Sequence, residues 1–526
     1  MPSAADPRAR VRDLVCSRFG HRELHPGQEE AITALLEDHD VLLVAPTGAG
    51  KSLVYQAAGL LLDRPTLVVS PLLALQHDQI EGLEEIGLCG GRISSAEGER
   101  ERAETLRAAA EGRLDFVFLS PEQLANDDMR EQVASLKPGL VAVDEAHCVS
   151  AWGHDFRPDY FRLGDLIADL GTPRVIAMTA TAAPPVRDDI GVRLGLREPR
   201  TIVTGFTRPE LELAVRRVVD EGEQRRTVLE EVAAHQGAGI VYCRTRPATE
   251  EYAEALAGSG RRTAAYHAGM SARRRDEVHG AFLDGEIEVV VATSAFGMGI
   301  DKPDVRFVIH AQAPESPDTY YQEAGRAGRD GEPAVGLLVY RPEDLALGRF
   351  FSPGVPKEAD LRAVWEADSA DAHPEGMSTR RRQRIRNLLD LARESHPDQD
   401  PVPTARELAE AHRSLERSRV EMLRGYAETQ RCRMAFLVGY FGEPVEDRCG
   451  VCDNCRDGVA PEPTDDRDAA FAVQARVVHE EFGEGVVTDV EEDRLTVLFD
   501  DVGYRTLSLE LIQSERLLRP NGGRLG

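Results

Sequence analysis

The stretch of sequence that decides the fold is VLLVAPTGAGKS, residues 41–52. An apolar run of strand length comes first, and a glycine-containing loop and a helical pattern follow it. Gly48 and Gly50 let backbone amides approach a phosphate group, and Lys51 supplies a point charge to the outer phosphates. The hydroxyl of Ser52 can bind Mg²⁺. We therefore predict a phosphate-binding loop whose nucleotide contacts are Thr47, Gly48, Ala49, Gly50, Lys51 and Ser52.

Outward from this loop, short apolar runs alternate with amphipathic stretches between residues 40 and 350. Runs that are apolar on both faces, with helical patterns between them, are typical of parallel strands in α/β layers. A break in the pattern near residues 200–230 divides the runs into two sets, which predicts two tandem α/β domains. The first set is 41–45, 66–70, 116–120, 140–144 and 175–179, and the second is 239–243, 289–293, 307–310 and 336–340.

An acidic pair follows one of these runs, in the sequence DEAH at residues 144–147. A carboxylate at the end of a parallel strand lies on the same edge of the sheet as the phosphate-binding loop. Asp144 is then placed to hold Mg²⁺ through water, and Glu145 to orient and deprotonate an attacking water. Together with the loop, this pair predicts ATP hydrolysis that depends on Mg²⁺.

A second basic element lies in the other predicted domain, in YQEAGRAGRDG at residues 321–331. Arg326 and Arg329 are three residues apart, which would put them on one helical face. From there they could reach the γ-phosphate as arginine fingers. We therefore expect a split ATP site, in which ATP binding and hydrolysis close and open a cleft between the domains.

Composition limits the function in two ways. The formal net charge is −28 and the pI about 5.0, which argues against nucleic-acid binding through overall charge but does not exclude a local basic groove. The N-terminal residues lack the apolar region of a signal peptide, and no apolar run approaches the roughly 20 residues that span a bilayer. We therefore expect a cytoplasmic protein with no membrane partner.

The eight cysteines fall into two groups. Cys16, Cys89, Cys148 and Cys243 are scattered and are interpreted as buried or inert thiols. The other four have metal-ligand spacing and would close a tetrahedral structural Zn²⁺ site. That site is formed by Cys432, Cys449, Cys452 and Cys455. The neighbouring Arg431, Arg433 and Arg448 are either DNA contacts or solvated charges.

The motifs also support a resemblance to a known family. They occur in the order expected of a superfamily 2 helicase, and residues 15–456 resemble RecQ-family DNA helicases, most specifically in DEAHCVSAWGHDFRP (144–158). The resemblance implies two RecA-like domains, with Gln28 contacting adenine, Thr181 coupling ATP to domain closure and Gln322 in the catalytic set. It also implies a loop that senses single-stranded DNA through stacking and phosphate contacts. That loop would be formed by Trp152, His154, Phe156 and Arg157.

The rest of the chain divides by composition and resemblance. Full-length RecQ enzymes continue with a winged helix, but the tail here resembles the small barrel of UvrD-type helicases. That resemblance suggests a protein or nucleic-acid partner; the acidic composition of the tail favours a protein partner, and a passive cap is the other interpretation. Losing the winged helix predicts weaker duplex unwinding with translocation retained. The RRRQRIR run (380–386) could bind DNA or form a solvated helix face. The predicted domains are 1–203 and 204–350 (RecA-like), 351–417 (charged helical insertion), 418–456 (zinc-binding), 457–470 (linker) and 471–526 (β-barrel).

The function these features predict is that of an ATP-dependent 3′→5′ DNA helicase or translocase in repair or recombination. Its partners would be single-stranded and partly duplex DNA, with ATP, Mg²⁺ and Zn²⁺ as cofactors. Two alternatives stay open. One is an RNA-directed DEAH motor, and the other is a factor that recruits or remodels repair proteins through its tail with little unwinding.

Overall fold

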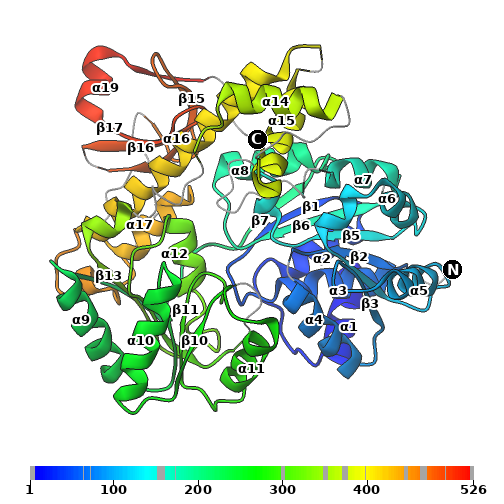
Figure 1. The fold of residues 1–526 in the computed structure, drawn as a ribbon, viewed down its shortest axis with the longest axis horizontal. Coiled ribbons are helices and arrows are strands. Elements are labelled where there is room, and N and C mark those ends of the chain that lie inside the picture. The colour runs from blue at the N-terminus through cyan, green and yellow to red at the C-terminus, as the bar shows by residue number, and fades with distance from the viewer. Residues whose placement is uncertain are drawn as a thin grey trace.

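The computed structural model describes residues 6–62, 64–71, 73–150, 160, 162–171, 173–297, 302–346, 354–369, 377–396, 398–443, 448–461, 471–491 and 493–521. Two α/β lobes lie side by side, and a helical unit and a small C-terminal sheet lie across one end of the pair (Figure 1). Within the described ranges, no helix combines the length and apolar character that crossing a membrane requires.

Lobe 1 is a seven-stranded parallel sheet in the order β3-β4-β2-β5-β6-β1-β7. Its strands are β1 (Val41–Val44), β2 (Thr66–Val69), β3 (Gly90–Ile93), β4 (Phe116–Leu119), β5 (Leu140–Val143), β6 (Arg174–Thr179) and β7 (Arg200–Val203). Its helices are α1 (Pro7–Phe19), α2 (Gln28–Leu36), α3 (Lys51–Leu62), α4 (Leu73–Glu85), α5 (Glu99–Ala110), α6 (Asp127–Ala134), α7 (Leu163–Asp169) and α8 (Pro184–Arg193), with 3₁₀ turns η1 (Pro121–Ala125) and η2 (Ala146–Val149).

Lobe 2 is a six-stranded parallel sheet in the order β10-β11-β9-β12-β13-β8. Its strands are β8 (Leu211–Arg217), β9 (Ala238–Tyr242), β10 (Thr263–Tyr266), β11 (Val289–Ala292), β12 (Val305–His310) and β13 (Ala334–Tyr340). Its helices are α9 (Glu221–Ala234), α10 (Arg246–Gly258), α11 (Ala272–Leu283) and α12 (Pro317–Ala324), followed by the 3₁₀ turn η4 (Pro342–Asp344). The prediction of two tandem parallel-sheet domains is confirmed.

All nine apolar runs singled out in the sequence are interior strands of these sheets. The four strands that the apolar pattern missed, β3, β7, β8 and β10, are the edge strands. An edge strand has a neighbour on one side only and carries more polar residues, as in GGRI of β3 and TAAY of β10. A search for runs apolar on both faces therefore finds the middle of a parallel sheet and misses its edges.

The helical unit consists of α14 (Glu358–Ser369), α15 (Thr379–Ser395), α16 (Pro401–Glu428), α17 (Arg433–Tyr440) and α18 (Asp453–Arg456). Its first three helices share a small core that includes Leu361, Ile385 and Val402. The predicted helix around residues 380–392 lies inside α15. Helix α16 then runs from this core to lobe 2 and passes beside the C-terminal sheet (Figure 1).

The C-terminal unit, predicted as a small β-barrel, is an antiparallel sheet in the order β17-β16-β15-β14-β18. Tyr504 attaches it to the helical unit. The backbone N–H of Tyr504 donates to Ser418 Oγ on α16 at 2.9 Å, and its ring stacks on Tyr440 of α17 with the centroids 4.7 Å apart. Its elements are β14 (Arg476–His479), β15 (Gly483–Val490), β16 (Arg494–Phe499), β17 (Gly503–Ser508), α19 (Leu509–Glu515) and β18 (Leu518–Pro520).

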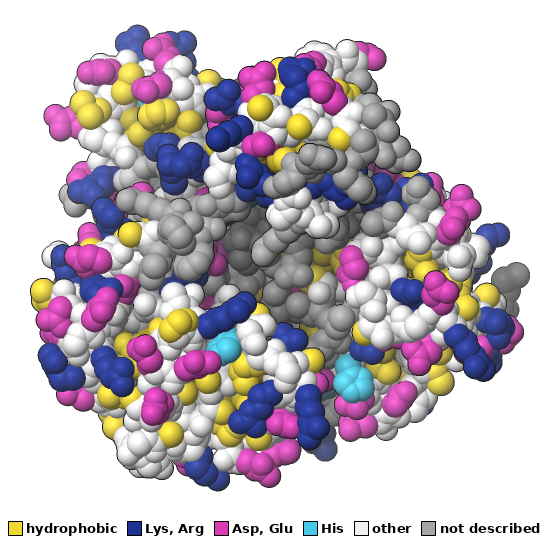
Figure 2. Space-filling model, viewed as in Figure 1, with side chains coloured by type: hydrophobic (Ala, Val, Ile, Leu, Met, Phe, Trp, Pro, Cys, Tyr) yellow, Lys and Arg dark blue, Asp and Glu magenta, His cyan; other side chains and the backbone are white. Residues whose placement is uncertain are grey.

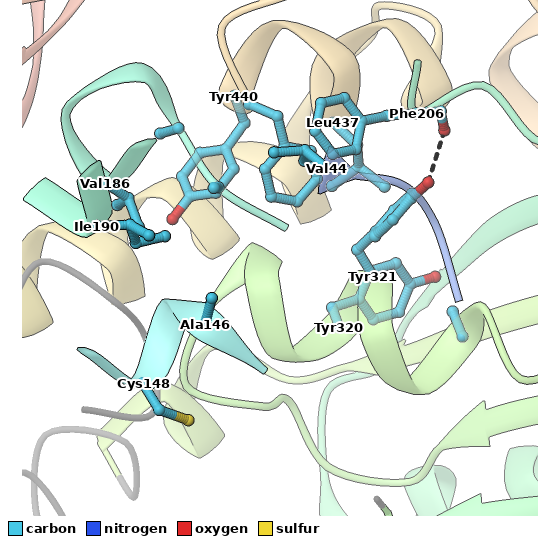
Figure 3. Packing of buried hydrophobic residues seen from close by; sticks show 14 of the residues in the cluster. Val44, Ala146, Cys148, Val186, Ile190, Phe206, Tyr320, Tyr321, Leu437 and Tyr440 are labelled. Atoms are coloured by element: carbon cyan, nitrogen blue, oxygen red, sulfur yellow. Dashed lines mark hydrogen bonds between the residues drawn. The ribbon is translucent and has the colours of Figure 1, made fainter. Parts of the chain in front are cut away.

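The segment joining the two lobes is packed rather than loose. Phe206 stacks on Phe441, just after α17, with ring centroids 4.5 Å apart. The Tyr321 hydroxyl, on α12, donates to Phe206 O at 2.7 Å (Figure 3). Buried aromatic pairs of this kind add about 0.5–1.5 kcal/mol each beyond area burial. The path of the chain between the lobes is thus tied to α12, whose C-terminal end leads into Arg326 and Arg329.

Candidate active site between the two lobes

A cavity of about 270 Å³ opens between the lobes at the carboxyl end of β1. The phosphate-binding loop and the acidic pair line it from lobe 1, and Gln322, Arg326 and Arg329 line it from lobe 2. The sequence-predicted residues are therefore brought together across the lobe boundary. The complete lining is Thr47, Gly48, Gly50, Lys51, Ser52, Leu75, Gln79, Asp144, Glu145, Pro303, Gln322, Arg326 and Arg329.

The two loop glycines have left-handed backbones, with φ of +87° at Gly48 and +66° at Gly50. A Cβ at Gly48 would lie 3.3 Å from Arg329 Cγ, so the arginine of lobe 2 packs directly on the loop of lobe 1. Lys51 Nζ donates to Ala45 O at 2.9 Å. Burial lowers the pKa of Lys51, and nearby Glu145 and Asp144 oppose that shift. A phosphate entering the loop would offer Lys51 an anionic partner in place of a carbonyl.

Gln28 braces the phosphate-binding loop. Its Nε2 donates to Ala49 O at 3.0 Å and to Gly50 O at 2.9 Å, and its Oε1 accepts from the His25 N–H at 2.8 Å. A Cβ at Gly50 would lie only 2.7 Å from Gln28 Nε2, so the glycine is required by close approach as well as by its φ. The adenine contact expected of Gln28 stays a prediction.

The acidic pair lines the same cavity, with Asp144 buried and Glu145 half-buried. Burial, with the charge of Glu145, raises the pKa of Asp144 to about 7. A divalent cation between Asp144 and Ser52 would favour the ionised carboxylate. Ser52 Oγ also accepts a hydrogen bond from Gln79 Nε2 at 3.2 Å. Oxygen donors of this kind suit Mg²⁺, and the glycine backbone gives phosphate room, so both groups fit the cavity.

Glu145 has an unusual backbone for a non-glycine residue, with φ of +48°. Such conformations cost about 1–3 kcal/mol and persist where the surroundings impose them. The Glu145 carboxylate lies 3.3 Å from His147 Nδ1, and the same nitrogen lies 2.9 Å from Thr179 Oγ1. The strained turn therefore aims Glu145 into the cavity and leaves its carboxylate in contact with a buried imidazole.

A polar chain continues from His147 to the other lobe. Thr179 Oγ1 donates to Thr181 O at 3.0 Å, and Gln322 Nε2 donates to Thr181 Oγ1 at 3.4 Å. The sequence had singled out Thr181 and Gln322, but not His147 or Thr179 as links between them and Glu145. This chain gives lobe closure a direct route to the residue that would activate water.

The arginines are not on a helical face, which corrects one expectation. Helix α12 ends at Ala324, and residues 325–330 form turns, because Gly325 and Gly328 (φ +71°) interrupt the helix. Arg326 is buried, and within the described structure its Nε has no hydrogen-bond partner. A buried donor of that kind next to a phosphate-sized cavity is consistent with a role in contacting nucleotide.

Arg208 supports this arginine turn and was missed by the sequence analysis. It is buried, pairs with Glu210, and donates to Gly325 O at 3.2 Å and to Ala327 O at 3.1 Å. Both carbonyls flank Arg326. No local motif marks Arg208, which lies in the segment between the lobes. Only the folded chain brings it to the turn.

The four predicted zinc ligands form a compact cluster, with all four Sγ atoms within 4.8 Å of one another. A tetrahedral Zn²⁺ with Zn–S bonds of about 2.3 Å sets its sulfurs about 3.8 Å apart, so the cluster fits the ion with a small contraction. The Cys449 N–H lies 3.3 Å from Cys432 Sγ, and the Arg433 N–H lies 3.4 Å from Cys452 Sγ. Amides directed at sulfur stabilise thiolate ligands.

The zinc cluster is docked on lobe 2. Asp453 Oδ2 accepts from the Val215 N–H of edge strand β8 at 2.9 Å, and Asp453 Oδ1 accepts from buried Arg433 Nε at 2.5 Å. Arg431 pairs instead with Asp489 of the C-terminal sheet. Two of the three arginines beside the cysteines therefore hold the fold together rather than face solvent.

The loop predicted to sense single-stranded DNA lies outside the described residues. Trp152, His154, Phe156 and Arg157 all fall between residues 151 and 159. Their role stays a prediction.

Two parallel-sheet lobes that share one phosphate-binding cavity define a two-lobed ATP-driven motor of the helicase class. Comparison with protein families agrees. Residues 25–190 match the DEAD/DEAH box helicase family, residues 223–331 the helicase conserved C-terminal domain, and residues 379–456 the RecQ zinc-binding family. The last of these spans α15, α16 and the cysteine cluster.

Curated relatives give the family. The chain is 33% identical over 486 residues to "ATP-dependent DNA helicase RecQ" of Bacillus subtilis, covering 91% of this chain and 73% of that protein. It is 35% identical over 442 residues to the protein of that name from Haemophilus influenzae, covering 84% and 62%. The chain belongs to the RecQ family of ATP-dependent DNA helicases. It spans roughly two thirds of the length of these relatives, and like them it is an ATP-hydrolysing enzyme.

Solved structures share the fold at low identity. A Mycobacterium smegmatis helicase Lhr bound to single-stranded DNA and AMP-PNP has a TM-score of 0.53 at 23% identity, covering 84% of this chain and 63% of that one. Helicase MrfA bound to DNA and AMPPNP has a TM-score of 0.54 at 23% identity, covering 66% and 52%. Dbp5 of S. cerevisiae, bound to RNA, has a TM-score of 0.53 at 18% identity, covering 66% and 92%. The fold alone therefore does not choose between DNA and RNA.

Proposed function

We propose that this chain moves along single-stranded DNA in the 3′→5′ direction and separates duplexes in DNA repair or recombination. The observation that carries the proposal is the cavity lined by the loop of lobe 1 and the arginine turn of lobe 2. The 3′→5′ direction of movement and the role in repair or recombination are inferred from membership of the RecQ family. We further propose that the protein acts in the cytoplasm, as its bacterial relatives suggest.

In this proposal each lobe supplies part of the chemistry. Lys51 and the loop amides would hold the phosphates, and Ser52 and Asp144 would hold the Mg²⁺ of the bound nucleotide, which would supply positive charge beside the phosphates. Glu145 accepts a proton from the attacking water while His147 keeps its carboxylate oriented. Arg326 and Arg329 stabilise the charge on the transferring phosphoryl group, which requires the lobes to be closed. Hydrolysis leaves ADP and inorganic phosphate in the cavity, and the lobes separate once the phosphate that both contacted is released.

Closure would be sensed through the Thr181–Gln322 contact, and DNA would be sensed by the loop at Trp152, His154, Phe156 and Arg157. Flat side chains there would stack on unpaired bases while Arg157 holds a phosphate. The loop follows Glu145 and His147 directly in the chain. A shift of the loop on binding DNA can therefore be transmitted to the Glu145 carboxylate through only a few residues of chain.

The proposal is tested with Lys51→Ala, three duplex substrates, and single-stranded DNA and RNA. The wild-type protein should hydrolyse ATP faster with single-stranded DNA, and it should unwind 3′-tailed and forked duplexes better than 5′-tailed ones. Lys51→Ala should abolish both activities. DNA-stimulated hydrolysis by Lys51→Ala, or a preference for 5′ tails, would refute the proposal. Stronger stimulation by single-stranded RNA than by DNA would favour the RNA-directed alternative.

A protein partner for the C-terminal sheet is a second proposal, which starts from the predicted resemblance of the tail sequence to the UvrD-type barrel. Leu511 on α19 is 54% exposed, which leaves an apolar side chain on the outer side of this unit. Removing residues 471–526 would also uncover α16, so Leu511→Asp is the cleaner variant. Loss of a co-purifying partner with unwinding unchanged would support recruitment. A fall in unwinding without loss of binding would assign the sheet to the motor instead.

A further inference from the structure

A second cavity, of about 620 Å³, lies far from the ATP site in the sequence, between the residues that lead into α14 and the middle of α16. We call it the basic groove. Lys357, Arg406, Arg413 and Arg417 line it, together with Glu358 and Glu410. Its cations outnumber its acids two to one in a chain whose net charge is −28. The basic groove is thus a locally positive site on a molecule whose overall charge is negative.

The arginines of the groove form one stripe on α16. Positions 406, 413 and 417 are separated by seven and four residues, which puts all three on the same face of a helix. At a rise of 1.5 Å per residue this stripe is about 16 Å long. Lys and Arg side chains gather between the C-terminal sheet and the α14–α15 helices, where α16 passes (Figure 2).

The positive charge of the groove is only partly neutralised by the protein. Glu410 pairs with Arg406 at 3.0 Å, and Glu358 lies 3.7 Å from Arg362. Across the described ranges, no ion pair joins Lys357, Arg413 or Arg417 to a carboxylate. Both acids of the groove therefore have partners, while three of its four cations remain available to an anion from outside.

The neighbouring arginine run behaves differently. Arg381 on α15 pairs with Asp360 at 2.7 Å, and Arg384 donates to Gly354 O at 3.0 Å. Burial lowers the pKa of Arg384. These side chains help to join α15 to α14 and to the residues before it. The DNA contact that the sequence suggests for this run stays a prediction. Within the described residues, the groove cations without a carboxylate partner are Lys357, which precedes α14, and Arg413 and Arg417 of α16.

The chemistry of the lining indicates the ligand. Among the described residues that line the groove, none is aromatic, so these residues offer no surface on which unpaired bases could stack. Guanidinium groups in a row suit the phosphate groups of a duplex, which follow one another at about 3.4 Å of helix axis on each strand. We propose that the basic groove binds the phosphate backbone of duplex DNA, in addition to the single strand held by the lobes; this rests on the proposed action on tailed duplexes.

The position of the groove would make such binding useful to the motor. Arg419, two residues beyond Arg417 on α16, lies 3.9 Å from Asp318 of α12. The turn after α12 carries Arg326 and Arg329. Helix α16 thus presents the groove on one face and contacts the arginine-bearing part of lobe 2 on another. Duplex held in the groove would stay at a constant distance from lobe 2 as the lobes open and close.

The test measures binding of full-length protein, without nucleotide, to a blunt duplex, a 3′-tailed duplex and a single-stranded oligonucleotide at several salt concentrations. Arg413→Ala/Arg417→Ala should weaken duplex binding about 10-fold or more and reduce the slope of log affinity against log salt by about 2, at about 0.9 per lost phosphate contact. Binding to the single strand should be unchanged. Arg413→Lys/Arg417→Lys should restore most of the slope, because lysine still neutralises phosphate.

The matched control is Arg100→Ala/Arg107→Ala, which removes two exposed arginines from α5 of lobe 1 and should leave duplex binding intact. The proposal is overturned if Arg413→Ala/Arg417→Ala binds duplex with wild-type affinity and slope. It is also overturned if this variant loses single-strand binding equally, or if the control is equally impaired. Absence of DNA-stimulated hydrolysis in the wild type would instead refute the proposed function, while duplex binding would still be measurable.

Discussion

Replacing Arg208 with Lys should impair hydrolysis although Arg208 lines no part of the ATP cavity. The guanidinium donates to Gly325 O and Ala327 O, the two carbonyls on either side of Arg326. A lysine keeps the charge beside Glu210 but cannot reach both carbonyls from one planar fork. Loss of one charge-assisted hydrogen bond is worth about 1.5–3 kcal/mol. If that energy holds the arginine turn in place, kcat should fall about 10- to 150-fold, at tenfold per 1.36 kcal/mol.

The assay is steady-state ATP hydrolysis with saturating single-stranded DNA, together with thermal unfolding of both proteins. KM for ATP should change little, since the phosphate-binding loop is intact. The matched control is Arg341→Lys, because Arg341 makes a similar fork to Asp344 in lobe 2 away from the cavity. Arg341→Lys should cost similar stability with kcat unchanged. Equal kcat in Arg208→Lys and wild type, or equal losses in the two variants, would refute the reasoning.

Three further results follow from the structure. Thr181→Val removes the hydroxyl that Gln322 contacts, so DNA should stimulate ATP hydrolysis about 10-fold less while hydrolysis without DNA persists. Thr181→Ser keeps this hydroxyl and should behave like wild type. Cys449→Ser should reduce the zinc content to well below one ion per chain, measured by metal analysis, and should destabilise the helical unit. The control Cys16→Ser changes an exposed cysteine and should leave both zinc content and stability unchanged. A Cys449→Ser protein that still holds one zinc ion per chain would contradict the assignment. Tyr504→Ala should cost about 3–5 kcal/mol and increase hydrogen exchange in the C-terminal sheet, whereas Tyr504→Phe keeps the ring stack and should cost less than about 1.5 kcal/mol.

Much of the site could be predicted because its residues belong to short motifs. The phosphate-binding loop and the acidic pair each place their side chains within a few residues of one another, as do Cys449, Cys452 and Cys455, which only Cys432 joins from farther away in the chain. Local spacing is then nearly the same as spatial arrangement. The interior strands were predictable for a similar reason, since a strand covered on both faces must be apolar throughout.

What the sequence could not supply depends on contacts between distant residues. Arg208 meets the arginine turn from more than a hundred residues away. Thr179 joins His147 to Thr181 only because β5 and β6 lie side by side in the sheet. The placement of Arg326 and Arg329 on a helix was wrong because glycines after Ala324 end α12, which a spacing of three residues does not reveal.

The basic groove shows the same limit. A run of consecutive charges is easy to see in a sequence, but RRRQRIR contributes side chains to contacts within the helical unit. The groove collects Lys357 from one segment and its arginines from α16, at positions that are unremarkable in the sequence. A basic side chain is available to a ligand only if no carboxylate of the protein already pairs with it, and that pairing is seen only in the folded structure.

The central claim is that one ATP site is completed by both lobes, and Arg326→Ala tests it most directly. Binding of a fluorescent ATP analogue and single-turnover hydrolysis should be measured for wild type, Lys51→Ala and Arg326→Ala with saturating single-stranded DNA. Arg326→Ala should bind nucleotide within a few-fold of wild type but hydrolyse it about 10³-fold more slowly, as expected for loss of an arginine finger. Lys51→Ala should lose both. Hydrolysis by Arg326→Ala at the wild-type rate would show that lobe 1 works alone and would contradict the account.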